Sequence, residues 1–106
     1  MPFEIVRNDI VKMTVDAIVN TANPFPEIGT GVDTAIHKAA GHRLLQAREE
    51  IGNIVRGDAV ITPAFNLNAK YVIHTVGPVW NGGANGEADC LRSCYRKSLE
   101  LAKRND

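Results

Sequence analysis

Residues 19–37 read VNTANPFPEIGTGVDTAIH, and this stretch carries the most informative order of structural signals in the chain. The apolar run 17–19 leads into it and is typical of a strand buried on both faces. Positions 20–31 then hold two Asn, two Pro and two Gly, which predicts a loop of about ten residues. A helix is predicted over 32–40. The stretch is therefore a strand, a loop and a helix N-terminus in direct succession.

The rest of the chain continues this alternation. The pattern of β-branched and apolar residues predicts strands over 3–6, 58–62 and 71–76. A second helix is expected before the stop signal Gly52-Asn53, with Leu44, Ala47, Arg48 and Ile51 on one face. The clearest helix is 89–103, with an apolar stripe at helical spacing. Strands followed by helices indicate an α/β sandwich with a largely parallel sheet.

Length and charge exclude several classes of protein. The chain has 106 residues, enough for one domain, and its 12 basic and 12 acidic residues give no net charge. That balance argues against a broad basic surface for nucleic acid. There is no apolar run long enough to span a membrane and no secretory signal, so a soluble cytoplasmic protein is expected. Cys90 and Cys94 are interpreted as buried or half-buried thiols in a reducing cytoplasm, since neither cysteine nor histidine spacing predicts a metal site.

The strand–loop–helix arrangement is suited to holding a phosphate. The first N–H groups of a helix have no partner within the helix, and the helix dipole favours an anion there. Gly29 and Gly31 would let the backbone approach a ligand closely. The spacing matches neither a dinucleotide fingerprint nor a P-loop, so a structural turn is the alternative. Glu27 argues against an anion site unless its carboxylate points to solvent.

Four stretches of the chain resemble macrodomains: residues 17–23 (AIVNTAN), 29–41 (GTGVDTAIHKAAG), 57–62 (GDAVIT) and 69–80 (AKYVIHTVGPVW). They occur in order and at family spacing, and they are most similar to the bacterial branch that includes ADP-ribosyl hydrolases and O-acetyl-ADP-ribose deacetylases. The resemblance implies a three-layer α/β/α sandwich with a mixed, largely parallel sheet. It also implies a surface cleft for ADP-ribose and no need for a metal or another cofactor.

The same resemblance implies roles for individual residues. Asp9 would accept a hydrogen bond from the adenine amine, with the backbone of Ile10 beside it. Asn20 and Ala22 are placed with the ligand-binding residues, and Ala22 and Asn23 would lie near the distal ribose. The backbone N–H groups that would surround the diphosphate belong to Gly29, Thr30, Gly31 and Val32. Asn23 and Asp33 would be the catalytic pair, Asp33 orienting or activating the attacking water.

From the residues alone, other roles remain open. Asn20 and Asn23 are also ordinary turn residues, and Asp33 is also an ordinary acid at a helix start. His37 and His74 are interpreted as packing residues, His74 as a core imidazole with its hydrogen bonds satisfied. Trp80 is interpreted as a packing residue or an aromatic at the rim of the cleft.

The chain departs from the family pattern in its glycine loop and in its extent. Ile28-Gly29-Thr30-Gly31 stands where a run of four glycines is usual, and Thr34 replaces a small glycine. The family's second phosphate loop and last strands would follow Asp106, so residues 1–106 are expected to be the N-terminal part of a macrodomain. An exposed sheet edge would then favour self-association.

Three functions follow as alternatives. The first is an ADP-ribosyl or O-acetyl-ADP-ribose hydrolase, and the second is a module that binds ADP-ribose or an ADP-ribosylated protein without turnover. The third is a fragment that folds and binds no ligand. Neither a nucleic acid nor a membrane is expected as a partner.

Overall fold

A computed structural model describes residues 3–79 and 81–105. Its elements, in chain order, are η1 (Ile10–Lys12), β1 (Val15–Thr21), α1 (Val32–Ala40), α2 (Arg43–Ile51), β2 (Ala59–Pro63), β3 (Ala69–Thr75) and α3 (Glu87–Arg104). The expected helix over 32–40 is confirmed at both ends, and Gly52 follows α2 as predicted, with a φ of 88° that favours glycine. Trp80 lies outside the described residues.

The three strands form one mixed sheet in the order β1-β3-β2. β1 pairs with β3 in parallel, from Val15 opposite Ala69 to Thr21 opposite Thr75, and β2 pairs with β3 antiparallel. The antiparallel pair follows from the short connection between β2 and β3, because a parallel pair would need a longer crossover. β1 and β3 are joined by such a crossover, which contains α1 and α2.

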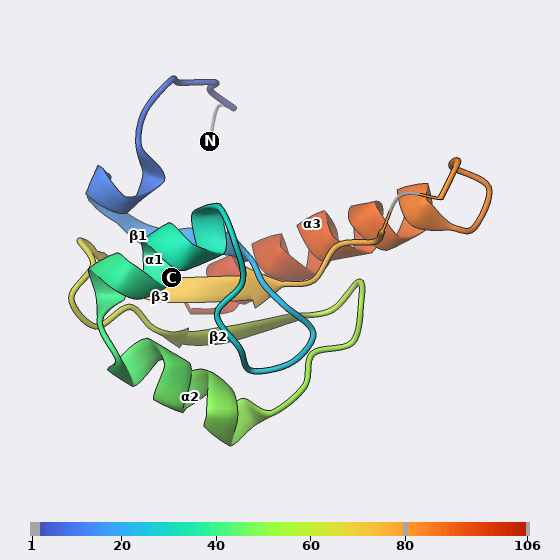
Figure 1. Cartoon of the computed structure of the whole chain (residues 1–106). Helices are drawn as coiled ribbons and strands as arrows, with labels where there is room; N and C mark the ends of the chain where they lie inside the picture. The colour runs from blue at the N-terminus through green and yellow to red at the C-terminus, as the bar shows by residue number, and fades with distance from the viewer. Residues whose placement is uncertain (1–2, 80, 106) are drawn as a thin grey trace.

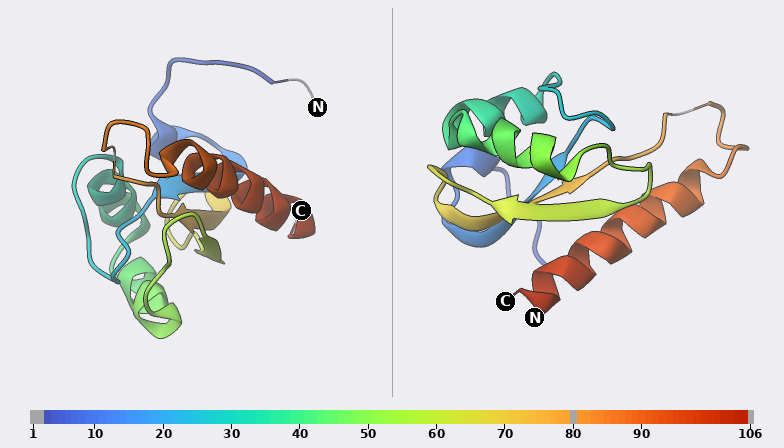
Figure 2. Two further views of the ribbon diagram at one scale, coloured as in Figure 1. Left: turned by 90° about the vertical axis from the view of Figure 1, so that its right-hand side faces the viewer. Right: turned by 90° about the horizontal axis from the view of Figure 1, so that it is seen from below.

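Helices cover both faces of the sheet. α1 and α2 lie on one face and α3 lies on the other, as Figure 1 and the right-hand view of Figure 2 show. The expected three-layer α/β/α architecture is therefore confirmed. The hydrophobic core lies between the sheet and α1 and α2, and its buried members include Ile18, Ile36, Leu44 and Val72. This packing fixes the N-terminus of α1 at the end of β1 where the loop begins.

Two strand predictions were wrong. Residues 3–6 form no strand; they are extended, and Phe3 and Ile5 are almost fully exposed. The pattern was misleading because a strand needs a neighbour, and β1 pairs only with β3 among the described residues. β1 itself is not buried on both faces, since Ile18 and Asn20 are buried while Val19 between them is 44% exposed. An edge strand with one covered face alternates in this way.

The apolar stripe of α3 is only partly covered. Cys94 and Ser98 are buried against the sheet, and the Cys94 thiol donates a hydrogen bond to the Val76 carbonyl at 3.2 Å. Tyr95 and Leu99 of the same stripe are 67% and 68% exposed. Both cysteines are free thiols, Cys94 buried and Cys90 partly buried. Across residues 3–79 and 81–105, each helix is too short or too polar to span a lipid bilayer.

Candidate functional site

The candidate site is built around the loop of residues 22–31, here called the ligand loop. It leaves β1 where the parallel pair β1–β3 ends, and its first amide, that of Ala22, donates to the Thr75 carbonyl of β3 at 2.9 Å. It enters α1 at Gly31, whose φ of 65° and ψ of −128° suit glycine. Ligands of open α/β sheets bind at this carboxyl end of the strands.

Asp33 holds the two ends of the ligand loop together. Asp33 is 1% exposed, and its Oδ1 accepts a hydrogen bond of 2.6 Å from the Asn20 side chain on β1. Its Oδ2 accepts a hydrogen bond of 2.6 Å from the Gly29 amide in the loop. Burial raises the pKa of this carboxyl, but the nearby His37 and the hydrogen bonds from Asn20 and Gly29 outweigh it and lower the pKa to about 2. Asp33 is therefore ionised at every physiological pH.

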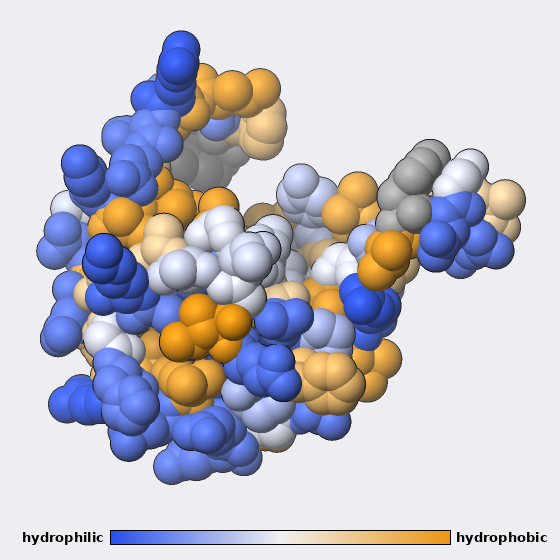
Figure 3. Space-filling model, in the orientation of Figure 1, coloured by the Kyte–Doolittle hydropathy of each residue, from blue (hydrophilic) through white to orange (hydrophobic). Residues whose placement is uncertain are grey.

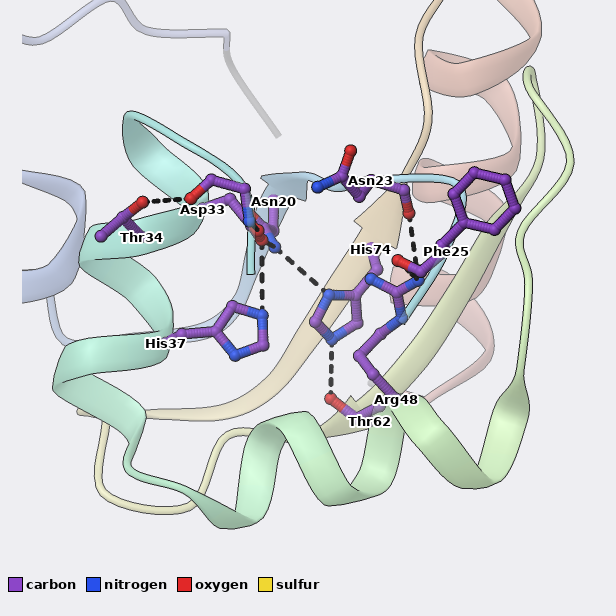
Figure 4. A network of polar contacts seen from close by, with 10 residues as sticks. Asn20, Asn23, Phe25, Asp33, Thr34, His37, Arg48, Thr62 and His74 are labelled. Atoms are coloured by element: carbon purple, nitrogen blue, oxygen red, sulfur yellow. Dashed lines mark hydrogen bonds and ion pairs between the residues drawn. The ribbon is translucent and has the colours of Figure 1, made fainter. Parts of the chain in front are cut away.

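A buried hydrogen-bond chain continues from Asn20 into the sheet (Figure 4). The Asn20 amide nitrogen lies 3.3 Å from Nδ1 of His74, and Nε2 of His74 lies 3.0 Å from the Thr62 hydroxyl. Because the Asn20 nitrogen is a donor, Nδ1 is assigned as the acceptor and Nε2 as the protonated nitrogen. Burial, followed by the positive charge of Arg48, lowers the pKa of His74 to about 3. The prediction of a satisfied core imidazole at His74 is confirmed.

His37 packs beside this network. It is 4% exposed, and its Nε2 lies 3.4 Å from Oδ1 of Asp33, one helical turn earlier in α1. Its place inside the protein agrees with the interpretation of His37 as a packing residue.

Sequence reasoning gave no role in the site to Arg48, which lies in α2 and is fully buried. One guanidinium nitrogen, Nη2, donates to the carbonyls of Asn23 and Phe25 in the ligand loop, at 3.0 and 3.3 Å. The helical pattern predicted Arg48 on the apolar face of its helix. Because arginine is rarely buried, its place on that face could have marked it as a candidate site residue. An arginine on a core-facing stripe needs acceptors inside the protein, and the loop carbonyls provide them.

The amides predicted to surround a diphosphate divide into two groups. The Gly29 amide is occupied by Asp33, whereas the amides of Thr30, Gly31 and Val32 donate to no acceptor within the described residues. Gly29 lies close to the Asn23 side chain: a Cβ at Gly29 would lie 2.9 Å from the Asn23 side-chain nitrogen, which would have to shift. Three successive N–H groups without an acceptor among the described residues therefore stand at the start of a nine-residue helix, where the helix dipole favours an anion.

The remaining predicted residues lie around this arrangement. Asn23 is partly buried, and its side-chain amide points away from Arg48 while its carbonyl faces the guanidinium (Figure 4). Ile28 in the loop and Val32 at the start of α1 are 49% and 46% exposed. The face of the molecule seen in Figure 3 mixes apolar and polar side chains. Glu27 is exposed.

Asp9 and Ile10 lie at η1, outside the hydrogen-bond network around Asp33. Asp9 is exposed, and its carboxylate caps η1 by accepting from the Val11 amide at 3.2 Å. Ile10 packs against the core below α1. Within residues 3–79 and 81–105, the His, Cys, Asp and Glu side chains form no cluster that could hold a metal ion.

The Macro domain family model matches residues 19–106. The chain belongs to the macro domain family. A macro domain-containing protein of Chlorobaculum tepidum is 57% identical over 97 residues, which are 92% of this chain and 56% of that protein. A Salmonella typhimurium protein named O-acetyl-ADP-ribose deacetylase is 52% identical, over 96% of this chain and 59% of that protein. This macro domain chain therefore spans a little over half the length of these curated relatives.

A solved structure supports the same assignment. The macrodomain of Oceanobacillus iheyensis with ADP superposes with a TM-score of 0.87 and 42% identity, covering 92% of this chain and 55% of that one. A glycine-to-valine variant of that macrodomain has been solved with ADPR. The macro domain fold of the chain is established by these similarities together with its own three-layer architecture.

Proposed function

We propose that this macro domain chain binds ADP-ribose, free or attached to a protein, through the ligand loop. The observation that carries the proposal is the row of free amides at Thr30, Gly31 and Val32, placed at the N-terminus of α1. A diphosphate at this position would accept from these N–H groups and interact favourably with the helix dipole. The ADP and ADPR complexes of the Oceanobacillus relative support the same ligand class.

The distal ribose belongs, in this proposal, beside Ala22 and Asn23. The Asn23 side chain points away from the buried network and can donate to or accept from a ribose hydroxyl. Asp9 and Ile10 are assigned to the adenine. Asn20 is assigned an indirect part, because its buried side chain orients Asp33 and the strand end rather than contacting the ligand.

We propose hydrolysis of an O-acetyl-ADP-ribose ester or an ADP-ribosyl bond as the associated activity. Water would attack the acyl carbon or the anomeric carbon, the bond to the leaving oxygen would break, and the water proton would pass to that oxygen. Asn23 and a phosphate of the ligand would hold the water. Asp33 has a pKa of about 2 and both oxygens engaged, so it acts as a positioning residue and a weak base.

The low pKa of Asp33 and its two engaged oxygens also favour a second candidate function, which is binding of ADP-ribose without hydrolysis. A carboxylate that is 1% exposed contacts water poorly, and the chain could then bind ADP-ribose without turning it over. The two candidates share the binding site and differ only in the chemical step.

Calorimetry with ADP-ribose, ADP and AMP tests the binding proposal. We expect saturable binding of ADP-ribose that Asn23→Ala weakens by about tenfold, as expected for loss of one buried polar contact. Asn68→Ala, an exposed asparagine before β3, should leave the affinity unchanged. Absence of ADP-ribose binding by the folded chain would overturn the proposal. Release of acetate from O-acetyl-ADP-ribose, or of ADP-ribose from a modified protein, separates the enzyme from the binding module.

A further inference from the structure

Arg48 is an unusual residue to find inside this protein. It is the largest fully buried side chain among residues 3–79 and 81–105. Removing a guanidinium from water costs free energy unless its donors find acceptors. Among the described residues Arg48 forms no ion pair, and its Nε and Nη1 atoms make no hydrogen bond. The protein therefore keeps a buried cation whose only hydrogen-bond acceptors, in the part of the chain that the structure describes, are two carbonyls of the ligand loop.

Those contacts fix the direction of the loop backbone. Arg48 binds the carbonyls of Asn23 and Phe25, and the amide of Ile54 donates to the Pro24 carbonyl between them at 2.7 Å. Three successive carbonyls are thus tied to α2 and the segment that follows it. These carbonyl oxygens carry partial negative charge and accept hydrogen bonds inside the protein. They therefore point away from an anionic ligand and do not repel it. Hydrogen bonds from a charged donor are stronger than hydrogen bonds between neutral groups. The two bonds from Arg48 are therefore the strongest of the three that hold these carbonyls.

The opposite end of the loop is held by Asp33 through Gly29. The loop is therefore held at two points by buried groups of opposite charge, one on α1 and one on α2. Figure 4 shows the Arg48 guanidinium below the Asn23–Phe25 segment while the Asn23 side chain points to the other side. Without the contacts of Arg48 or of Asp33 the ligand loop would lose its fixed conformation. Its two prolines stiffen the backbone, but it has few other internal hydrogen bonds.

We propose that Arg48 is a positioning residue for the ligand loop, holding the carbonyls of Asn23 and Phe25 so that the Asn23 side chain and the amides of residues 30–32 are presented to the ligand. The inference deepens the proposed function and rests on it for the identity of the ligand. The geometric part, loop positioning by Arg48, is independent of which ligand binds.

Arg48→Met tests the proposal, with Arg43→Met as the matched control. Both remove one cation from α2, but Arg43 is exposed and lies over the Phe65 ring at 4.8 Å. We expect Arg48→Met to weaken ADP-ribose binding by about tenfold or more, the scale of a lost charged hydrogen bond, and Arg43→Met to change it less than twofold. Equal affinities for the two folded variants would overturn the proposal.

Amide hydrogen exchange separates this outcome from a failure of the proposed function. If the unmodified chain does not bind ADP-ribose, faster exchange at Ala22, Gly29 and Ile54 in Arg48→Met than in Arg43→Met still supports loop positioning, and unchanged exchange refutes it. If Arg48→Met does not fold, Arg48→Lys takes its place, since lysine keeps the charge but not the forked donor geometry. Exchange in Arg48→Lys that is faster only in the loop supports the proposal, and exchange equal to that of the unmodified chain refutes it.

Discussion

The side-chain amide of Asn20 donates a hydrogen bond of 2.6 Å to the carboxylate of Asp33, across 13 positions of sequence. Asn20 is completely buried near the end of β1, and Asp33 is 1% exposed in the first turn of α1. This bond ties a strand to a helix across the base of the ligand loop. The loop conformation therefore depends on side chains below it, which makes it sensitive to substitutions that no ligand would touch.

Asp33→Asn should destabilise the protein by about 2 kcal/mol or more at pH 7, because the new amide presents a donor to the donors of Asn20 or Gly29. The pKa of Asp33 is about 2 in the folded protein against 3.8 in the unfolded chain. Its ionised form therefore stabilises the fold above pH 4, and that contribution is lost as the pH falls toward 2. Urea unfolding should show the difference between the two proteins shrinking below pH 4. A constant difference down to pH 2 would contradict this account, and Asp16→Asn at an exposed site serves as the control.

The lowered pKa of His74 predicts a second pH dependence of the free energy of unfolding, at higher pH than that of Asp33. Its pKa is about 3 when folded, because it is buried and close to the charge of Arg48, against 6.5 when unfolded. Below pH 6.5 the unfolded chain binds a proton that the folded one does not, so stability falls as the pH is lowered toward 3. The loss should reach about 2 kcal/mol at pH 5. His74→Gln should flatten the profile between pH 7 and 5, whereas His42→Gln, at an exposed position, should keep it.

Much of the fold could be predicted because local signals agree with the tertiary structure. The helix over 32–40 ends where Gly41, with a φ of 96°, ends it, and residues 71–76 lie in or next to the central strand. The strand expected over 3–6 failed because alternation of side chains does not supply a neighbouring strand. The spacing of apolar residues in α3 correctly predicted a helix. That spacing does not show how much of the apolar face of the helix packs against the sheet.

The site was less predictable for a related reason. Gly29, Gly31 and Asp33 could be singled out because a strand–loop–helix order gives them a chemical meaning. Arg48 lies 25 residues from Asn23, and only the packing of α2 against β2 and α1 brings it below the loop. Likewise the resemblance to macrodomains implied a water for Asp33 to orient, whereas the structure shows its two oxygens already used by Asn20 and Gly29.

Gly29→Ala should weaken ADP-ribose binding by about tenfold, since one displaced loop contact is of that order. The added Cβ would lie 2.9 Å from the Asn23 side-chain nitrogen and 3.3 Å from Oδ2 of Asp33, so the Asn23 side chain must shift away from its place beside the ligand. Gly77→Ala is the matched control, because a Cβ at Gly77 meets no atom within 4 Å and its φ is not positive. Calorimetry on both variants is the measurement. Equal affinities would show that the close approach at Gly29 is unimportant for the ligand.

Glu27→Gln should raise the affinity for ADP-ribose, by about twofold at low ionic strength. Glu27 is an exposed carboxylate in the ligand loop and repels a diphosphate through solvent, where the interaction is small and screened by salt. The gain should disappear in high salt. Glu49→Gln, an exposed carboxylate on α2, changes the net charge equally and should have a smaller effect. A gain that persists in high salt would indicate a steric or hydrogen-bonding cause instead.

Self-association at high protein concentration is predicted by the uncovered side of α3 and by the edge of β1 that has no neighbouring strand among residues 3–79 and 81–105. Leu99 is 68% exposed and, with Ala17, Tyr71 and Ala102, lines a shallow groove between α3 and the sheet. Exposed apolar surface beside an unpaired strand edge favours contact with a second copy. Sedimentation equilibrium should show dimers that Leu99→Lys weakens, while Ala88→Lys, exposed at the start of the same helix, leaves them unchanged. Leu99→Lys should also leave ADP-ribose affinity unaltered, because α3 covers the face of the sheet opposite α1. A chain that stays monomeric at all concentrations, or dimers that both variants weaken equally, would refute this role for the groove.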